Sequence, residues 1–448
     1  MFPSTTYQNR RAALAQRVGN GLILLPGNNE APMNYRDNIY PFRQDSNFRY
    51  FAGLNKPNLV VAIDASTGET TLYGTDITMD HIVWMGEQPS VRELADSVGI
   101  EHTAAPAELA TLLTKTTQTV HYLPPYREER FRRLQDWLGK DRDFIEANAS
   151  EAAIRAVVAI RSIKTSEEIV EMEKAVQTSR AMHHAAMDLA KPGMTEAEIA
   201  GVIEGIAISA GGRLSYPAIV TVNGQILHNH YHGNILKEGD LLLIDAGAES
   251  DSGYAGDITR TFCIGRAMDA QQQAIYDIVK RAEEDVIADL KPGVPYRDYH
   301  QQAVLIIATG LTELGIMKGD PQAAVTAGAH TLFFPHGLGH MIGMDVHDME
   351  DLGEDRVGYT KEIVRSPEFG TRALRLGRTL EAGFVITVEP GIYFIPALID
   401  QWQAEDKCTD FINYAALAQY RDFGGIRIED NVLITENGCR VLGDGIRK

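Results

Sequence analysis

The first 150 residues alternate between helix-like and strand-like patterns of hydrophobic and polar positions. Residues 10–18 predict a helix, and the apolar run 21–25 predicts a buried strand. Two further β-like runs, 59–63 and 69–73, are separated by a turn that contains glycine, and this arrangement predicts a hairpin. The pattern therefore indicates a small α/β domain in the N-terminal part of the chain.

Two capping boxes mark the starts of helices in the middle of the chain. Thr165 is followed three residues later by Glu168, and Thr195 is followed in the same way by Glu198. The first box opens a long helical stretch, which we expect to end near Ala190, before Lys-Pro-Gly. These signals predict two successive helices after the first domain.

Beyond residue 215 the chain carries short β-like runs separated by helical stretches. The predicted strands are 218–222, 241–246, 254–264, 384–389 and 426–435, and the predicted helices are 270–290 and 299–314. Strands and helices of comparable weight indicate an α+β domain. We place the domain boundary near residue 158, which gives domains over residues 1–157 and 158–448.

Length, charge and cysteine content fit a two-domain globular protein. The chain has 448 residues, of which 44% are hydrophobic and 23% charged. Its formal net charge of −19 disfavours binding to nucleic acid or to an anionic membrane. The three widely spaced cysteines argue against a disulfide framework, and no signal-like apolar run follows the N-terminal arginines. We therefore expect a cytoplasmic protein.

Two aspartates flank a turn in the segment 241–264. Asp245 ends an apolar run, and Asp257 follows twelve residues later, after the turn residues Ser-Asp-Ser-Gly. If the hairpin folds about Asp251, the two aspartates oppose each other at roughly 5 Å. Carboxylates this close repel unless a proton or a cation lies between them. Two solvated acids beside a loop are the alternative.

Three histidines lie in one glycine-rich segment of twelve residues. His336 and His340 belong to Pro-His-Gly-Leu-Gly-His, and His347 belongs to Asp-Val-His-Asp. The glycines argue against a regular helix and so against the helical zinc-protease pattern. For one histidine alone a surface or core role is the simpler interpretation, whereas the cluster favours a metal or catalytic site.

Two more acidic residues lie on β-like runs near the C-terminus. Glu389 ends one run, and Glu429 alternates with Arg427 so that both point to one face of a strand, for which a solvated face is the alternative. Four strand-borne acids and one loop histidine suit two hard or borderline divalent cations, such as manganese. Two cations bridged by carboxylates can hold a hydroxide and polarise a carbonyl, so the residues predict two-metal hydrolysis.

With these motifs in this order, the chain resembles the pita-bread metallopeptidases, specifically the Xaa-Pro dipeptidases (prolidases) and aminopeptidases P. The resemblance rests on the aspartate pair, HGLGH, DVHD, VEPG and GIRIED, and residues 42–53 resemble the N-terminal domain of this family. It implies an α+β pita-bread catalytic domain preceded by a smaller α/β N-terminal domain, in a homodimer or homotetramer. Methionine aminopeptidases generally lack that N-terminal domain, and creatinase lacks the full set of ligands.

The resemblance also implies which residues hold the metal. The implied ligands of two divalent cations, expected to be Mn²⁺, are Asp245, Asp257, His340, Glu389 and Glu429. Asp257 and Glu429 would bridge the two cations. A hydroxide between the cations would attack the scissile carbonyl, and Glu389 would transfer its proton.

Further residues receive roles toward the substrate from the same resemblance. His228 would lie near the substrate, His347 would stabilise the tetrahedral intermediate, and His336 would line the proline pocket. Arg427 would orient the bridging carboxylates or contact the substrate. Trp84 resembles a tryptophan that a neighbouring subunit inserts into the site in relatives, with core packing as the alternative.

One arginine favours a dipeptidase over an aminopeptidase. The segment 372–378 resembles the arginine-bearing stretch of prolidases, in which Arg375 would pair with the free carboxylate of proline. A solvated surface helix is the alternative. We therefore expect hydrolysis of Xaa-Pro dipeptides, with release of the N-terminal residue from longer proline-containing peptides as the alternative. A non-catalytic peptide-binding relative and a phosphotriesterase side activity are further alternatives.

Overall fold

The computed structural model describes residues 2–443 and 445–448, which form two compact units. The units comprise Met1–Arg161 with Met349–Arg356, and Ser162–Asp348 with Val357–Lys448. The domain limit after residue 157 stays a prediction, and this point lies inside helix α8 (Glu151–Ser162). Among the described residues, no helix combines the length and the apolar character needed to cross a membrane.

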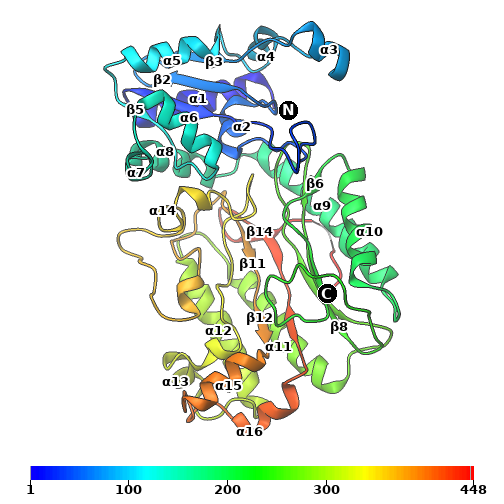
Figure 1. Cartoon of the computed structure of the whole chain (residues 1–448). Coiled ribbons are helices and arrows are strands. Elements are labelled where there is room, and N and C mark those ends of the chain that lie inside the picture. The colour runs from blue at the N-terminus through cyan, green and yellow to red at the C-terminus, as the bar shows by residue number, and fades with distance from the viewer. Residues whose placement is uncertain (1, 444) are drawn as a thin grey trace. The chain divides into compact units, whose positions relative to one another are not determined.

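The first unit is built on a five-stranded sheet in the order β4-β3-β2-β1-β5 (Figure 1). Its strands are β1 (Leu22–Pro26), β2 (Val60–Asp64), β3 (Thr70–Tyr73), β4 (His102–Ala104) and β5 (Val120–His121). Its helices besides α8 are α1 (Ser4–Val18), α2 (Ser46–Ala52), α3 (Met79–Met85), α4 (Val91–Ser97), α5 (Pro106–Lys115), α6 (Glu128–Leu138) and α7 (Arg142–Ala147). Strands β2 and β3 pair antiparallel, which confirms the predicted hairpin.

The helices of the second unit include those that the capping boxes predicted. They are α9 (Ser166–Leu189), α10 (Glu196–Ser209), α11 (Ala270–Asp289), α12 (Tyr296–Glu313), α13 (Pro321–Thr326), α15 (Pro396–Ala404) and α16 (Tyr414–Leu417), while α14 (Glu354–Gly358) spans a change of unit. Both predicted capping boxes are present, at Thr165 and Thr195. Helix α12 begins three residues earlier than predicted, because Pro295 precedes it and has no N–H to satisfy, and Asp298 favours its first turn.

Two small three-stranded sheets form the framework of the second unit, in the orders β10-β8-β7 and β11-β14-β15. The strands are β6 (Arg213–Leu214), β7 (Ile219–Thr221), β8 (Leu241–Asp245), β9 (Ala248–Glu249), β10 (Thr259–Cys263), β11 (Val385–Val388), β12 (Gly391–Tyr393), β13 (Gly425–Arg427), β14 (Asp430–Ile434) and β15 (Cys439–Val441). Helices α9 and α10 pack on each other, as do α11 and α12. The predicted mixture of helices and antiparallel strands is confirmed.

A hydrophobic core joins the helix pair α9 and α10 to strands β7 and β8. Its largest buried members are Met182, Ile199, Ile203, Val220, Leu242, Ile244 and Ile264. Side chains alternate across a strand, so β8 can bury Leu242 and Ile244 in this core while Asp245 points to the opposite face. The core therefore fixes the direction in which the first candidate ligand faces.

A buried histidine of α12 should make the stability of the protein depend on pH. His300 is 2% exposed, and neither ring nitrogen has a hydrogen-bond partner among the described residues. Burial, with a smaller effect of His330, lowers the pKa of His300 from 6.5 to about 3. Below pH 6.5 the unfolded chain therefore binds a proton at His300, whereas the folded chain does not. The contribution of neutral His300 to the free energy of unfolding is fully present above pH 6.5 and is lost as the pH falls toward 3.

We expect His300→Phe to flatten the stability profile in this pH range. The wild type should lose about 1.4 kcal/mol of unfolding free energy per pH unit below 6.5 through this one group. Phenylalanine fills similar space beside Phe334 and takes up no proton. Denaturant unfolding at pH 7 and pH 5 measures the difference, with the exposed His102→Phe as control. Parallel pH profiles for wild type and His300→Phe would contradict the expectation.

Candidate metal centre

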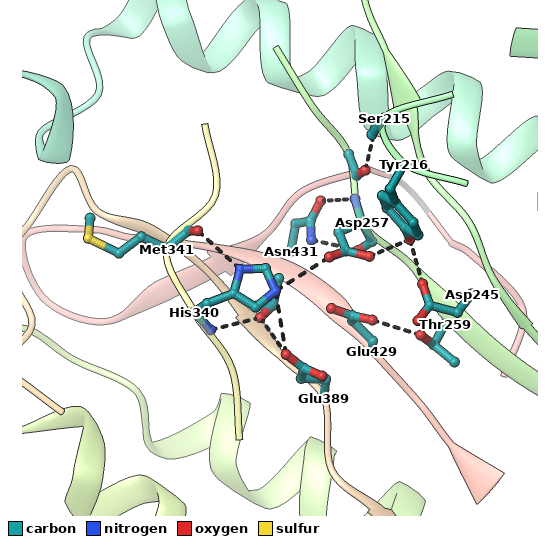
Figure 2. Close-up of polar contacts among 12 residues, drawn as sticks. Ser215, Tyr216, Asp245, Asp257, Thr259, His340, Met341, Glu389, Glu429 and Asn431 are labelled. Atoms are coloured by element: carbon teal, nitrogen blue, oxygen red, sulfur yellow. Dashed lines mark hydrogen bonds and ion pairs between the residues drawn. The ribbon is translucent and has the colours of Figure 1, made fainter. Parts of the chain in front are cut away.

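Three buried side chains in the second unit each direct one potential ligand atom toward a common point (Figure 2). They are Asp257, His340 and Glu429, and their ligand atoms all lie within 4.8 Å of one another. His340 Nε2 lies 3.4 Å from Asp257 Oδ2 and 3.5 Å from Glu389 Oε1. One imidazole and three carboxylates from separate segments thus meet at one place.

The two aspartates of the hairpin do not oppose each other in the sheet, so this part of the prediction was wrong. Asp245 pairs with Thr259, because the turn is centred on Ser252 and not on Asp251. A shift of the turn by one residue moves the pairing partner by two, and residues two apart on a strand share a face. Asp257 therefore still faces the same side as Asp245.

Tyr216 joins the two aspartates and was not among the residues predicted from the sequence. Its hydroxyl lies 2.5 Å from Oδ1 of Asp245 and 2.5 Å from Oδ1 of Asp257 (Figure 2). The single hydroxyl proton can be donated to one carboxylate at a time. Burial, followed by the charges of these two aspartates, holds the pKa of Tyr216 well above its usual value, so the hydroxyl keeps its proton. No motif distinguishes this lone tyrosine, and only the folded chain brings it to the aspartates.

Backbone contacts fix the direction of Asp257 and His340. The Asn431 side chain accepts from Asp257 N at 3.0 Å and donates to Asp257 O at 2.6 Å. His340 Nδ1 lies 3.0 Å from the carbonyl oxygen of Met341, to which it can donate its proton. The tautomer with a protonated Nδ1 leaves a lone pair on Nε2, directed toward the carboxylates, as a metal-ligating histidine requires.

Glu429 and Arg427 are both buried, so the alternative of a solvated strand face was wrong. The predicted single strand over 426–435 is also divided, since β13 ends at Arg427 and β14 begins at Asp430. Glu429 lies at this break, where its N–H donates to Thr259 O at 3.1 Å and the Thr259 hydroxyl donates to Glu429 Oε2 at 2.7 Å. The interruption allows this side chain to enter the cluster.

Arg427 links the candidate ligands to the pocket residues. Its Nη2 donates to Asp245 Oδ2 at 2.6 Å, and its Nη1 donates to the Tyr393 hydroxyl at 2.9 Å. That hydroxyl also lies 2.8 Å from His336 Nε2. Arg427 therefore accompanies the four candidate acidic ligands and is hydrogen-bonded to one of them.

The residues present fit a divalent cation. Glu429 Oε1 is buried and has no hydrogen-bond partner among the described residues. Burial, then the charges of Asp257 and Glu389, raise the pKa of Glu429 well above its usual value. An unpaired buried oxygen among repelling carboxylates is costly, and a cation would satisfy the oxygen and remove the repulsion. Carboxylate oxygens with one imidazole suit hard or borderline ions.

Glu389 follows β11 and lies next to His340. Its N–H donates to Leu338 O at 2.8 Å, and the Thr387 hydroxyl donates to its Oε1 at 3.3 Å. The same hydroxyl accepts from His340 N at 3.0 Å. Burial raises the pKa of Glu389 to about 7, with His340 opposing and Asp257 reinforcing the shift. A carboxylate with this pKa can take up and release a proton near neutral pH.

The remaining predicted histidines lie around this cluster. The His347 ring packs edge-on against His340, with ring centroids 4.3 Å apart. Burial lowers the pKa of His336 to about 3, so its ring is neutral beside Tyr393. Burial and the charge of Arg427 lower the pKa of His228, and Asp245 opposes this shift. His228 is therefore within electrostatic reach of the candidate ligands.

Arg375 lies within electrostatic reach of the predicted substrate histidines. Its charge contributes to lowering the pKa values of both His228 and His336. A surface helix, the alternative for its segment, does not form, because residues Thr371–Ala373 make only a short 3-10 turn. Of the neighbouring arginines, Arg372 is exposed and Arg378 pairs with Glu381 at 2.7 Å.

Trp84 belongs to the first unit and is not a core residue. It lies on α3, a short helix without buried residues, and its side chain is 84% exposed. The core-packing alternative for this tryptophan was therefore wrong.

Comparison with known proteins agrees with the geometry. Residues 170–436 match metallopeptidase family M24, and residues 7–122 match the aminopeptidase P N-terminal domain. The Xaa-Pro dipeptidase of Homo sapiens is 32% identical over 438 residues, which cover 94% of this chain and 85% of that protein. A probable Xaa-Pro aminopeptidase of Podospora anserina is 34% identical over 437 residues, or 95% of this chain and 90% of that protein.

Solved structures resemble the whole chain. An Escherichia coli aminopeptidase P variant in complex with substrate is 31% identical and superposes with a TM-score of 0.82, covering 100% of this chain and 96% of that one. The aminopeptidase PepP of Pseudomonas aeruginosa is 28% identical, with a TM-score of 0.81 and the same coverage. These similarities confirm the expected pita-bread catalytic fold with its N-terminal domain. The chain therefore belongs to metallopeptidase family M24.

Proposed function

We propose that this metallopeptidase is a Xaa-Pro dipeptidase that uses two divalent cations, preferably Mn²⁺. Arg375 carries the choice of a dipeptidase, because a guanidinium within electrostatic reach of His228 and His336 suits a free carboxylate in a pocket for proline. The alternative is a Xaa-Pro aminopeptidase acting on longer peptides. That alternative draws support from relatives and solved structures with this name over nearly the whole chain.

The proposed ligand assignment follows the positions of the side chains. Asp245 would bind the first cation, and His340 and Glu389 would bind the second. Asp257 and Glu429 would bind both cations. Bound cations supply positive charge that activates water and polarises the scissile carbonyl. Asn431, Thr259 and Thr387 support this assignment, since each holds a candidate ligand in place by hydrogen bonds.

The protein groups around the cations would bind the substrate and move protons. Glu389 would take the proton from the attacking water and pass it to the leaving nitrogen. The neutral His336 and the Tyr393 hydroxyl would line the proline pocket. His228 and His347 would face the carbonyl of the substrate, and Arg427 would orient Asp245.

Arg375→Met is expected to impair dipeptide hydrolysis selectively. The wild type with Mn²⁺ should cleave Gly-Pro in preference to Ala-Pro-Ala. A hydrogen-bonded ion pair contributes about 2 kcal/mol, so the variant should lose roughly 30-fold in kcat/KM on Gly-Pro. The tripeptide has no carboxylate at that position, and its hydrolysis should change little. Arg372→Met, which alters an exposed neighbour, is the matched control.

Other results of the same assay would change the proposed substrate class or the proposed role of Arg375. A wild type that prefers Ala-Pro-Ala is an aminopeptidase, and Arg375 then has no role in carboxylate recognition. Equal losses on both peptides would assign Arg375 to the general architecture of the pocket. A metal-loaded protein that cleaves neither peptide would contradict the proposed Xaa-Pro specificity.

We further propose that the protein is a cytoplasmic homodimer or homotetramer in which Trp84 reaches the active site of a neighbouring subunit. The exposed apolar side chains on α3 support this assembly, namely Met79, Val83, Trp84 and Met85. The three cysteines are free, which suits a reducing compartment. Light scattering of the wild type and of Trp84→Ala tests the assembly, and a monomeric wild type would contradict it.

A further inference from the structure

The loop that carries His228 is held at both of its ends by one buried carboxylate. The segment 222–234, between β7 and β8, contains no helix or strand. Glu196, the first residue of α10, is 0% exposed. Its Oε1 accepts from Val222 N at 2.9 Å, and its Oε2 accepts from Asn234 N at 3.1 Å.

The side chain of Asn234 reinforces this arrangement. Its Nδ2 lies 3.1 Å from Glu196 Oε1 and 3.0 Å from Glu196 Oε2. Two backbone hydrogen bonds also join the start of α10 to the end of the loop. Glu196 N donates to Asn234 O at 3.0 Å, and Ala197 N donates to His232 O at 3.0 Å. The start of α10 therefore binds the end of the loop through both side chain and backbone.

The charge of Glu196 has no basic partner among the described residues of the chain. It is stabilised instead by amide N–H donors and by the N-terminal end of α10, where the helix dipole favours a negative charge. A buried carboxylate without these donors would be costly. The N–H groups of the two loop ends therefore stabilise the Glu196 carboxylate, and the carboxylate keeps both ends in place. Movement of either end would leave the buried carboxylate without one of its hydrogen bonds.

Inside the loop, two hydrogen bonds of Asn229 lie next to His228. Asn229 Nδ2 donates to the hydroxyl of the buried Thr221 at 2.9 Å, and Tyr231 N donates to Asn229 Oδ1 at 3.1 Å. His228 itself is exposed on the loop. Its position therefore depends on where the loop is anchored.

We propose that Glu196 is a positioning residue for His228. By fixing Val222 and Asn234 to one carboxylate, it sets the place of the intervening loop and with it the imidazole that faces the substrate. The inference deepens the proposed function and rests on it. Glu196 acts through His228 and touches neither substrate nor metal ligand.

The test is a double-mutant cycle with Glu196→Gln and His228→Ala, assayed on Gly-Pro with saturating Mn²⁺. Glutamine keeps the size of the side chain but turns an NH₂ group toward N–H donors. Misplacement of a catalytic group by such a change costs roughly 10- to 100-fold. We expect this loss in kcat/KM for Glu196→Gln, and no further loss when it is combined with His228→Ala. Mn²⁺ affinity should be unchanged.

Glu168→Gln is the matched control. Glu168 is also a buried glutamate in the first turn of a helix, α9, and accepts from Thr165 N at 3.0 Å and from the Tyr254 hydroxyl at 2.9 Å. Its substitution should lower stability but leave kcat/KM within about twofold of the wild type. An equal fall in kcat/KM for Glu168→Gln would show a general effect of destabilisation and overturn the proposal.

Hydrogen exchange gives a readout that does not depend on activity. Amides of residues 223–233 should exchange faster in Glu196→Gln than in Glu168→Gln. If Glu196→Gln does not fold, Asn234→Ala removes the side-chain hydrogen bonds to Glu196 from the loop side. This variant should show the same fall in kcat/KM and the same faster exchange. Faster exchange with unchanged kcat/KM, or losses that multiply in the double variant, would overturn the positioning role.

These outcomes also separate the proposal from the function on which it rests. A wild type that cleaves Gly-Pro while His228→Ala is fully active would reject the role of His228 and hence that of Glu196, with the peptidase assignment intact. A wild type without activity would reject the peptidase assignment itself.

Discussion

Replacing Asp257 or Glu429 by alanine is expected to abolish metal binding and peptide hydrolysis together. Both residues are buried, and their oxygens converge with His340 Nε2 within 4.8 Å. Loss of a ligand that both proposed cations would share should remove about 4 kcal/mol or more of transition-state stabilisation, which is roughly a 10³-fold fall in kcat/KM. Calorimetric titration with Mn²⁺ and steady-state kinetics on Gly-Pro measure the two effects.

Charge repulsion in the cluster allows loss of metal to be distinguished from loss of folding. Burial and neighbouring carboxylates raise the pKa of Glu429 well above its usual value, so without metal it is already driven toward its neutral form. Glu429→Gln should therefore unfold without metal at about the same temperature as the wild type. Excess Mn²⁺ should stabilise the wild type by about 2.7 kcal/mol at a hundredfold excess over Kd, and the variant far less.

Asp251→Ala provides the matched control for the aspartates. Asp251 belongs to the same hairpin as Asp257 but is exposed. It should keep both metal affinity and turnover. Full activity of Asp257→Ala or Glu429→Ala would contradict the metal site, whereas loss of activity with unchanged Mn²⁺ binding would contradict their assignment as shared ligands.

Elements that depend on local sequence were predictable. The capping boxes at Thr165 and Thr195 and the hairpin of β2 and β3 need only neighbouring residues, and all three are present. The register of β8 and β10 was missed because a turn can be centred on either of two adjacent residues without changing the pattern. Asp257 still lies on the same side as Asp245, because moving the turn by one residue moves the pairing partner by two, and residues two apart on a strand share a face.

Features that depend on distant residues were not predictable. Tyr216 reaches Asp245 and Asp257 across 29 and 41 residues, and no spacing rule connects them. The break before β14 depends on Thr259, whose backbone pairs with Glu429. A pattern of alternating residues cannot distinguish a solvated strand face from one buried against another strand that carries acids. Only packing makes that difference, and here it converts an apparent surface face into the site.

His347→Ala is expected to separate catalysis from metal binding. The His347 ring packs edge-on against His340, which lies at the cluster, whereas His347 itself is not among the converging ligand atoms. In the proposed function, His347 would donate to oxygen at the reacting carbonyl, where negative charge develops in the transition state. Removing one such donor costs roughly 10²- to 10³-fold in kcat. Mn²⁺ affinity should stay close to that of the wild type.

The comparison of kcat with KM decides between this role and simple support of His340. A donor used only in the transition state lowers kcat and kcat/KM equally and leaves KM unchanged. If the ring merely packed His340 in place, His347→Phe would restore activity, and His347→Ala would weaken Mn²⁺ binding. We expect His347→Phe to stay inactive and His347→Gln, which keeps a donor, to recover part of the rate. Unchanged turnover in His347→Ala would reject the role.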